Sequence, residues 1–259
     1  MREFDFVYRT ALHFDQEVKA HSFALRCVPF SDGRQKILEY TLEIAPDCRR
    51  TCLTDSFGNS YVSGFCEMPH DRFEFAIHGK ACIDENVRIF DSYMPVYAFE
   101  SEYTRPGWNL TEFYKNLTLR GKEPIIKAME LSNYLRSRMN YQKNSTHVKT
   151  TAEEAFSSRY GVCQDYTHIL LTLCRLAGIP CRYCAGLASS EGETHSWAEI
   201  WNNGTWHGLD PTNNVLVDDS YLKLSHGRDF LDCSIDRGIF TGVVSQNQSV
   251  ESRLTEVCQ

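Results

Sequence analysis

The sequence lacks several features that would place it in a specialised class of protein. No uncharged apolar run approaches the roughly 18 residues that a membrane-spanning helix needs. The first ten residues, MREFDFVYRT, carry acidic side chains and no long apolar stretch, so no secretion signal is visible. Basic residues are outnumbered by acidic ones, 27 against 34, and a nucleic-acid footprint would need a basic face. We therefore expect neither a membrane nor a nucleic acid as a partner.

The sequence does contain enough apolar material for a core, together with many cysteines. Its 259 residues, 42% of them hydrophobic, suffice for one large domain or two modest ones. Eleven cysteines are scattered along the chain, an odd number in a chain too long to need disulfide cross-links. Without a visible secretion signal, we expect most of these thiols to be reduced and the protein to be cytoplasmic.

Hydrophobic periodicity predicts strands in the first part of the chain. Apolar and polar residues alternate over residues 38–44 and 73–77, and turn sequences separate such runs. This predicts an antiparallel, sandwich-like β domain over residues 1–95. Residues 96–121 show neither the helical nor the strand period strongly, and we interpret them as a connection with room for one helical turn.

The remaining residues, 122–259, show helices first and strands afterwards. Pro124 fits the first position of a helix, Thr151 and Glu154 form a capping box, and a third helix begins around Cys163. Strands are expected after this helix at residues 181–187, 194–201 and 205–209. Separate blocks of helices and strands predict an α+β fold for the whole chain.

Cys163 differs from the other cysteines in its surroundings. It follows a break at Gly161 and begins an amphipathic helix, whose unpaired N–H groups and positive dipole end stabilise a thiolate. Its own N–H would also be free to help hold an oxyanion. Asp165 opposes the thiolate because it is a nearby carboxylate, and we interpret it mainly as a structural residue of the first helical turn. A histidine partner is therefore needed.

The hairpin expected after this helix supplies that partner. His195 opens one strand and Asp210 ends the next, nearly opposite it across the turn at Asn203. A carboxylate beside an imidazole fixes its tautomer and orientation, so Cys163, His195 and Asp210 form a set of nucleophile, base and orienting residue. Trp197 shares the strand face of His195 and either lines a substrate cleft or packs inside.

Other candidate residues have simpler interpretations. Cys181 and Cys184 form a C-x-x-C pattern, which can indicate zinc or redox chemistry. Within a strand, however, these positions point to opposite faces, and no second pair has the spacing of a zinc site. We therefore expect no metal and no cofactor. His168 is expected to be a packing residue, and His207 a core or surface residue.

Four segments resemble the core of the transglutaminase-like superfamily. They are Gly-Val-Cys-Gln-Asp at 161–165, Ala-Gly-Ile-Pro at 177–180, His-Ser-Trp at 195–197 and Asp-Pro-Thr-Asn at 210–213. The resemblance is closest to the bacterial branch, whose members are described as cysteine proteases. Residues 55–59 resemble its β-rich N-terminal region, and residues 227–229 and 238–242 resemble its C-terminal signature.

The resemblance implies a papain-like core with Cys163 as nucleophile, His195 as general base and acid, and Asp210 as orienting residue. Gly161, Asp165 and Trp197 would support the site or line its cleft. The expected reaction is cleavage of an amide bond in a peptide, protein or small amide, through an acyl-thioester. Two alternatives stay open: transfer of the acyl group to an amine, and a non-catalytic binding module on the same fold.

Overall fold

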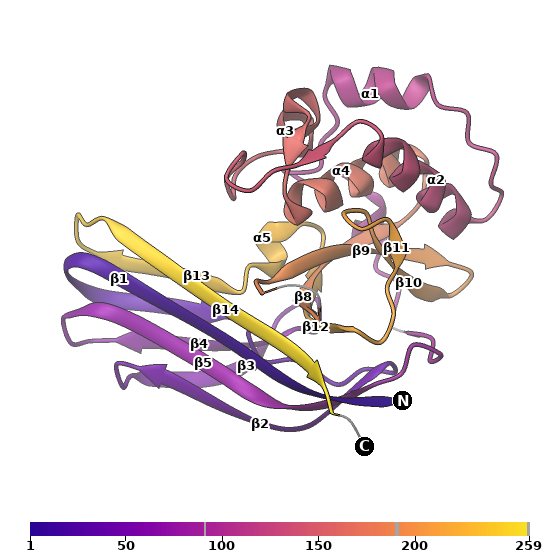
Figure 1. Ribbon diagram of the computed structural model, residues 1–259. Helices are drawn as coiled ribbons and strands as arrows, with labels where there is room; N and C mark the ends of the chain where they lie inside the picture. The colour runs from indigo at the N-terminus through magenta and orange to yellow at the C-terminus, as the bar shows by residue number, and fades with distance from the viewer. Residues whose placement is uncertain (91, 190–191, 258–259) are drawn as a thin grey trace.

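The computed structural model describes residues 1–90, 92–189 and 192–257. The chain forms a β-rich part and a second part in which helices cover a sheet (Figure 1). Seven strands build the β-rich part: β1 (Arg2–Leu25), β2 (Gln35–Ala45), β3 (Arg49–Thr54), β4 (Ser60–Cys66), β5 (His70–Ile83), β13 (Asp236–Thr241) and β14 (Gln246–Glu256).

The long strand β1 organises the β-rich part. Its first half pairs with β5 and β14, and its second half pairs with β4 and β13. All these pairings are antiparallel, with β2 outside β5 and β3 outside β4. The register of β1 against β5 shifts between His13 and Val18, so one strand serves both halves of a sandwich-like arrangement. The expected antiparallel, sandwich-like N-terminal region is confirmed, although one strand is far longer than the pattern indicated.

The core of this part comes from alternate residues of its strands. Phe73, Phe75 and Ile77 of β5 are buried, as the alternation over residues 73–77 predicts. The edge strand β2 behaves differently, because Leu38 and Tyr40 remain 45% and 47% exposed. The period-two pattern therefore identified the strand correctly but did not show how completely its apolar face is covered.

Two strands from the end of the chain belong to the β-rich part. β14 runs antiparallel to β1 with Phe4 opposite Glu256, so the two described chain ends lie side by side (Figure 1). The sequence pattern assigned β13 and β14 to the segment 122–259. In the structure, both strands pair with β1 in the sheet of the N-terminal strands. The pairing covers an edge of β1 that would otherwise expose unpaired backbone groups.

The second part contains another antiparallel sheet and the helices. Its strand order is β11-β10-β9-β8-β12. These strands are β8 (Cys181–Ala188), β9 (His195–Asn202), β10 (Thr205–Asp210), β11 (Val215–Leu216) and β12 (Tyr221–Gly227). The helices are η1 (Pro95–Ala98), α1 (Trp108–Lys115), α2 (Pro124–Arg136), α3 (Ala152–Ser158), α4 (Cys163–Leu176) and α5 (Phe230–Cys233), and a short parallel pair joins β6 (Asn140–Tyr141) to β7 (Tyr160–Gly161).

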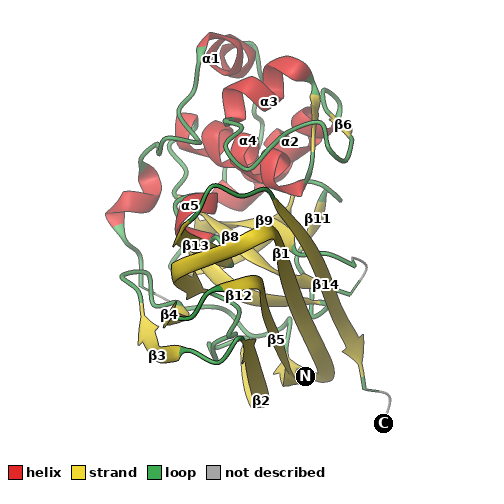
Figure 2. Cartoon of the chain, turned by 90° about the vertical axis from the view of Figure 1, so that its left-hand side faces the viewer, coloured by secondary structure: helices red, strands yellow, loops and turns green. Residues whose placement is uncertain are grey.

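Helix α4 is the centre of this part. All its residues from 165 to 174 are buried, as expected of a helix surrounded by protein on every side. It packs on β8 and β9 and is covered by α2 and α3, so the helices gather on one side of the sheet (Figure 2). Gly178, with φ of 69°, and Pro180 follow its end, as the sequence predicts. The α+β class is confirmed.

The connection at residues 96–121 contains more structure than expected. Besides the short η1, it holds the eight-residue helix α1. The carboxylate of Glu153, in α3, accepts hydrogen bonds from the N–H groups of Gly107, Asn109 and Leu110 at 2.8–3.1 Å. The helix start is thus capped by a residue distant in the chain, which explains why local patterns missed it.

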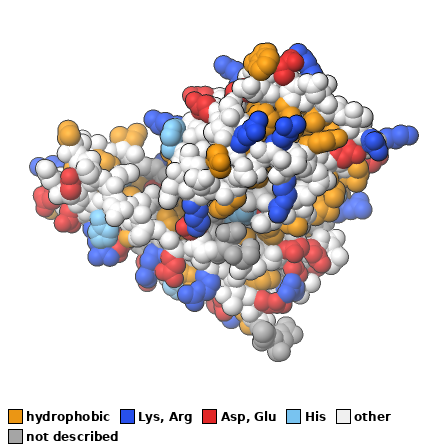
Figure 3. Space-filling model, turned by 45° about the horizontal axis from the view of Figure 1, so that its top comes forward, with side chains coloured by type: hydrophobic (Ala, Val, Ile, Leu, Met, Phe, Trp, Pro, Cys, Tyr) orange, Lys and Arg blue, Asp and Glu red, His pale blue; other side chains and the backbone are white. Residues whose placement is uncertain are grey.

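Charged side chains are distributed without a large patch of one sign on the face shown in Figure 3, where lysine, arginine, aspartate and glutamate intermingle. The net charge is −7. Among the described residues, no helix is both long and apolar enough to cross a membrane.

Candidate active site

Cys163 is the first residue of α4, the central helix, and is half-buried. The first turn of an α-helix leaves N–H groups without partners inside the helix, and the dipole makes this end positive. Val162 immediately precedes the helix in an extended conformation, with φ of −112° and ψ of −176°. The thiol therefore lies where a negative sulfur or oxygen is stabilised.

The side chain of Asp165 is held at the start of α4 by hydrogen bonds to the loop before the helix and does not act as an acid toward the thiol. Its Oδ2 accepts the N–H of Val162 at 2.8 Å and the hydroxyl of Thr146 at 2.7 Å. The side chain is buried, and burial raises its pKa, against these hydrogen bonds. Asp165 thus fixes the backbone before Cys163.

Gly161 provides the space that Asp165 occupies. A Cβ at position 161 would lie 2.7 Å from the Cβ of Asp165 and 2.9 Å from its Oδ2. Gly161 is also the last residue of β7, and its carbonyl oxygen accepts a hydrogen bond from the N–H of Gln142 at 3.0 Å. The glycine therefore acts through close packing of the loop that leads into Cys163.

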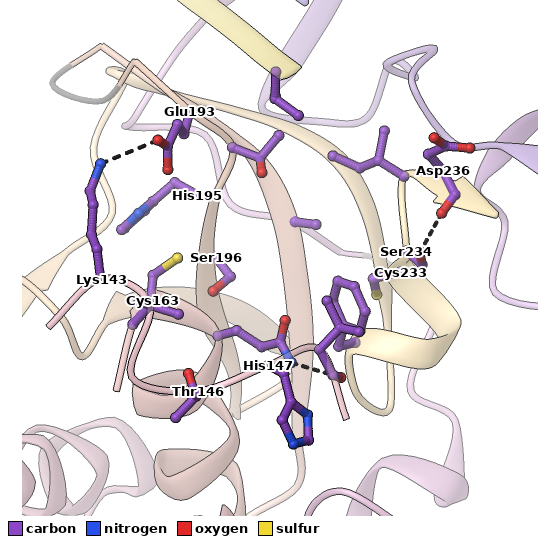
Figure 4. Close-up of a pocket in the computed structure, with 18 of the residues that line it drawn as sticks. Lys143, Thr146, His147, Cys163, Glu193, His195, Ser196, Cys233, Ser234 and Asp236 are labelled. Carbon is purple, nitrogen blue, oxygen red and sulfur yellow. Dashed lines mark hydrogen bonds and ion pairs between the residues drawn. The ribbon is translucent and has the colours of Figure 1, made fainter. Parts of the chain in front are cut away.

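His195 and Asp210 are brought together by the hairpin of β9 and β10. Leu209 pairs with Ala198, so His195 and Asp210 are diagonal neighbours on adjacent strands. The Nε2–H of His195 donates to Asp210 Oδ2 at 2.8 Å. Because Asp210 occupies Nε2, Nδ1 is the ring nitrogen left for the thiol. Figure 4 shows the sulfur of Cys163 directed toward this ring.

The carboxylate of Asp210 is fully buried and held by several donors. Oδ1 accepts the N–H groups of Thr212 and Asn213 at 2.8 and 3.2 Å. Oδ2 accepts the side-chain amide of Asn213 at 2.8 Å and the hydroxyl of Tyr221 at 2.9 Å, besides His195. Burial alone would raise the pKa of Asp210, but these bonds, first that of His195, hold it below its usual value. The carboxylate is therefore fixed in its charged form.

The imidazole of His195 is strongly basic in this setting. Burial would lower its pKa, but hydrogen bonds to Asp210 and Cys163 and the charges of both partners raise it to about 10. An imidazolium that faces both a carboxylate and a thiol is the arrangement that stabilises a thiolate. A proton can therefore pass between the sulfur of Cys163 and Nδ1 of His195 while Asp210 holds the ring.

Tyr221 and Asn213 were not assigned a role from the sequence. Asn213 lies in the Asp-Pro-Thr-Asn segment, so its position three residues after Asp210 was an available signal. Tyr221 comes from β12, at the far edge of the sheet, and no local sequence pattern predicts its contact with Asp210. Trp197 packs against Tyr221 with ring centroids 5.5 Å apart and is buried behind the site, so it supports Tyr221 and does not line the cleft.

A cleft of about 670 Å³ opens in front of Cys163 and His195 (Figure 4). One wall comes from the helical part, including Thr146, His147 and Gln164. The other comes from the β-rich part, including Tyr8, Gln248 and Val250. The N-terminal strands therefore contribute directly to the space in which a substrate would lie.

The remaining sequence candidates lie away from the reacting groups. His168 is buried in α4, and His207 is half-buried in β10, where its Nε2 lies 2.9 Å from the Thr205 hydroxyl. Cys181 and Cys184 belong to two different packed clusters, as expected for i and i+3 positions of a strand. Ser196, in contrast, lines the cleft next to His195, and its hydroxyl lies 3.3 Å from that of Thr167 in α4, which ties β9 to the central helix.

Comparison with known proteins identifies the family. Residues 111–211 match the transglutaminase-like superfamily, and residues 4–81 match the bacterial transglutaminase-like N-terminal region. An uncharacterised protein of Mycobacterium tuberculosis is 30% identical over 249 residues, covering 82% of this chain and 79% of its own. The chain belongs to the transglutaminase-like superfamily.

A further relative and one solved structure match this transglutaminase-like protein over nearly its whole length. An uncharacterised protein of Mycobacterium leprae is 24% identical and covers 97% of this chain and 98% of its own. The crystal structure of a "putative cysteine protease" from Cytophaga hutchinsonii superposes with a TM-score of 0.83, covering 100% of this chain and 92% of its own at 20% identity. The combination of β-rich region and transglutaminase-like core is therefore a shared architecture.

Proposed function

We propose that the protein is a cysteine-dependent hydrolase of amide or peptide bonds, with Cys163, His195 and Asp210 as its catalytic residues. The observation that carries this proposal is the meeting of three elements at one cleft: the start of α4 and two adjacent strands. Membership of the superfamily and the name given to the Cytophaga neighbour support a cysteine-dependent enzyme.

The reaction begins with proton transfer from the Cys163 thiol to Nδ1 of His195. The sulfur attacks the carbonyl carbon of the substrate, and the resulting oxyanion lies near the N–H groups at the start of α4. His195 then gives its proton to the leaving amine, and the C–N bond breaks to leave an acyl-thioester on Cys163. Water, deprotonated by His195, attacks this thioester and releases the acid.

Asp210 acts throughout as the partner of Nε2. It keeps this nitrogen protonated, directs Nδ1 toward Cys163 and stabilises the imidazolium that forms. Tyr221 and Asn213 hold the carboxylate in place and are positioning residues. If an amine reached the thioester before water, the same groups would carry out acyl transfer.

Selective alkylation tests the activated thiol directly. In the full-length protein near neutral pH, iodoacetamide should modify Cys163 faster than the exposed Cys52, which provides the rate of an unactivated thiol. Peptide mapping by mass spectrometry measures both rates in one sample. Equal rates at the two positions would contradict the activated nucleophile and favour a binding module.

Trapping of the acyl-enzyme then distinguishes the two reactions. Peptide and glutamine-amide libraries should produce an adduct on Cys163 that is absent in Cys163→Ala, and this variant should keep the fold. Added primary amine should leave the acid as the main product if the enzyme is a hydrolase. A product dominated by the new amide would instead identify a transglutaminase, and an unchanged adduct in Cys163→Ala would contradict the assignment of the nucleophile.

A further inference from the structure

A group of imidazole and thiol side chains lies inside the β-rich part, among residues that do not line the Cys163 cleft. His21, Cys66 and His70 each offer one ligand atom, and these atoms lie within 4.8 Å of one another. All three side chains are buried. We propose that they bind a zinc ion, with Cys48 as the fourth ligand.

The strand register aligns three of these four residues. His21 of β1 lies directly opposite Cys66 of β4. On the other side of β4, Arg49 pairs with Phe65, which places Cys48, the residue just before β3, beside Cys66. Residues directly opposite one another on neighbouring strands point to the same face. Cys48 also packs against the cluster of buried side chains that contains Cys66, so the row of side chains is continuous.

His70 completes the set from the first position of β5. Its Nδ1–H donates to the carbonyl oxygen of Met68 at 2.9 Å, which leaves the lone pair on Nε2. That nitrogen lies 3.1 Å from Nδ1 of His21. Metal-binding histidines usually donate their second N–H in this way. Two nitrogens bound to tetrahedral zinc lie about 3.3 Å apart, close to the separation seen here.

The surroundings favour a cation whose charge is balanced by its ligands. Four phenylalanine rings surround the imidazole of His21: Phe14, Phe23, Phe73 and Phe240. A Cβ at Gly238 would lie 2.6 Å from His21 Nε2, so the glycine lets β13 close over the ring. Two thiolates and two neutral imidazoles neutralise Zn²⁺ exactly in charge, and this ligand set with tetrahedral geometry suits zinc.

Zinc binding would require a change of tautomer at His21 and the release of two thiol protons. In this structure, His21 Nδ1–H donates to the lone pair of His70 Nε2. When zinc binds, His21 takes the tautomer with its proton on Nε2, and both facing nitrogens bind the ion. The two thiols release their protons to solvent. Without a metal, the same groups would form only a hydrogen-bonded pair of histidines beside two thiols.

Cobalt titration tests the site in the full-length protein after reduction and removal of metals with a chelator. Co²⁺ should bind with one equivalent and give the visible absorption of a tetrahedral ion and an ultraviolet thiolate-to-cobalt charge-transfer band. Added Zn²⁺ should abolish both spectra and raise the melting temperature. Absence of a saturable tetrahedral spectrum, or a Cys48–Cys66 disulfide in protein prepared under reducing conditions, would overturn the proposal.

Matched variants locate the ligands. Cys48→Ser and Cys66→Ser should each weaken cobalt binding by about tenfold or more and reduce the charge-transfer band. Cys52→Ser, at an exposed position of β3, and Cys163→Ser should leave titration and spectrum unchanged. Cys48 is only partly buried, so its variant keeps the test decisive if Cys66→Ser folds poorly. Unchanged spectra in both Cys48→Ser and Cys66→Ser would contradict the site, whatever the activity of Cys163.

Discussion

Two buried histidines of the helix-covered part, His168 and His195, behave in opposite ways. His168 lies on α4, where its Nε2 accepts the N–H of Phe230 at 3.1 Å. Its ring lies 5.5 Å from that of Tyr103 and 5.2 Å from that of Tyr183, measured between centroids. Burial, and to a smaller extent the charge of Arg175, lowers its pKa to about 3. This histidine is a neutral packing residue.

His195 is also buried, at the wall of the cleft, but has different partners. Asp210 and Cys163 outweigh burial and raise its pKa to about 10. The comparison teaches that burial disfavours the charged imidazole at both positions, and that an anionic partner decides which histidine can exchange protons. Proximity of a histidine to α4 is therefore not enough to let it exchange protons.

The largest expected effect is on the reactivity of Cys163. His195→Ala should slow alkylation of Cys163 by about 10²–10⁴-fold, because the thiolate loses the imidazolium that stabilises it. The measurement is the rate of iodoacetamide labelling by mass spectrometry at neutral pH.

His168→Gln is the matched control for this experiment. Gln retains an acceptor for the N–H of Phe230, and the variant should lose stability but keep the Cys163 labelling rate. If both variants slowed labelling equally, general disruption of the helix would explain the result, and the contrast between the two histidines would fail.

The two histidines should also give stability opposite dependences on pH. The folded pKa of His195 lies above its ordinary value of 6.5, so its contribution is complete below pH 6.5 and is lost as pH rises toward 10. The folded pKa of His168 lies below 6.5, so its contribution is complete above that pH and is lost as pH falls toward 3. Each slope can reach about 1.4 kcal/mol per pH unit.

Urea unfolding across the pH range measures these slopes. Subtraction of the curve of His195→Gln from that of the native protein should isolate a loss on the alkaline side. The same subtraction with His168→Gln should isolate a loss on the acidic side. Two difference curves of the same sign would show that the partners of the two rings do not determine their protonation.

Much of this arrangement could be predicted from local sequence. The glycine break before Cys163 and the Asn-Gly turn between β9 and β10 are local signals, and they placed Cys163 at a helix start and His195 beside Asp210. The strand class of the first third also followed from alternation. These features depend on residues close together in the chain.

Features that join distant segments could not be predicted in this way. Tyr221 reaches Asp210 from another strand, and Glu153 caps α1 from another helix. Three of the residues proposed to bind zinc lie on separate strands and Cys48 directly precedes a fourth strand; only the register brings His21, Cys66 and Cys48 into one row. Cys181 and Cys184 are close in the sequence, but the fold places them in different clusters. Cys48 and Cys66 are distant in the sequence and become neighbours only through the pairing of β3 with β4.

The carboxyl groups of Asp210 and Asp236 differ in the same way as the two histidines: one has hydrogen-bonding partners and the other is only buried. The expected effect on stability is smaller. Asp210 is surrounded by donors, whereas none of the described residues donates a hydrogen bond to the carboxyl of Asp236, which lines the cleft. Burial raises the pKa of Asp236 to about 6 from an ordinary value of 3.8. Its charged form is therefore disfavoured by folding, and stability falls as pH rises from about 4 to 6.

Asp236→Asn should accordingly stabilise the protein at pH 8 by about 1–2 kcal/mol and have little effect at pH 4, where the native carboxyl is already protonated. Urea unfolding at the two pH values measures the difference. Asp71→Asn, at an exposed position of β5, is the matched control and should change neither value. A loss of stability at pH 8 in Asp236→Asn would mean that the native carboxylate has a favourable partner, and that burial without donors does not describe this acid.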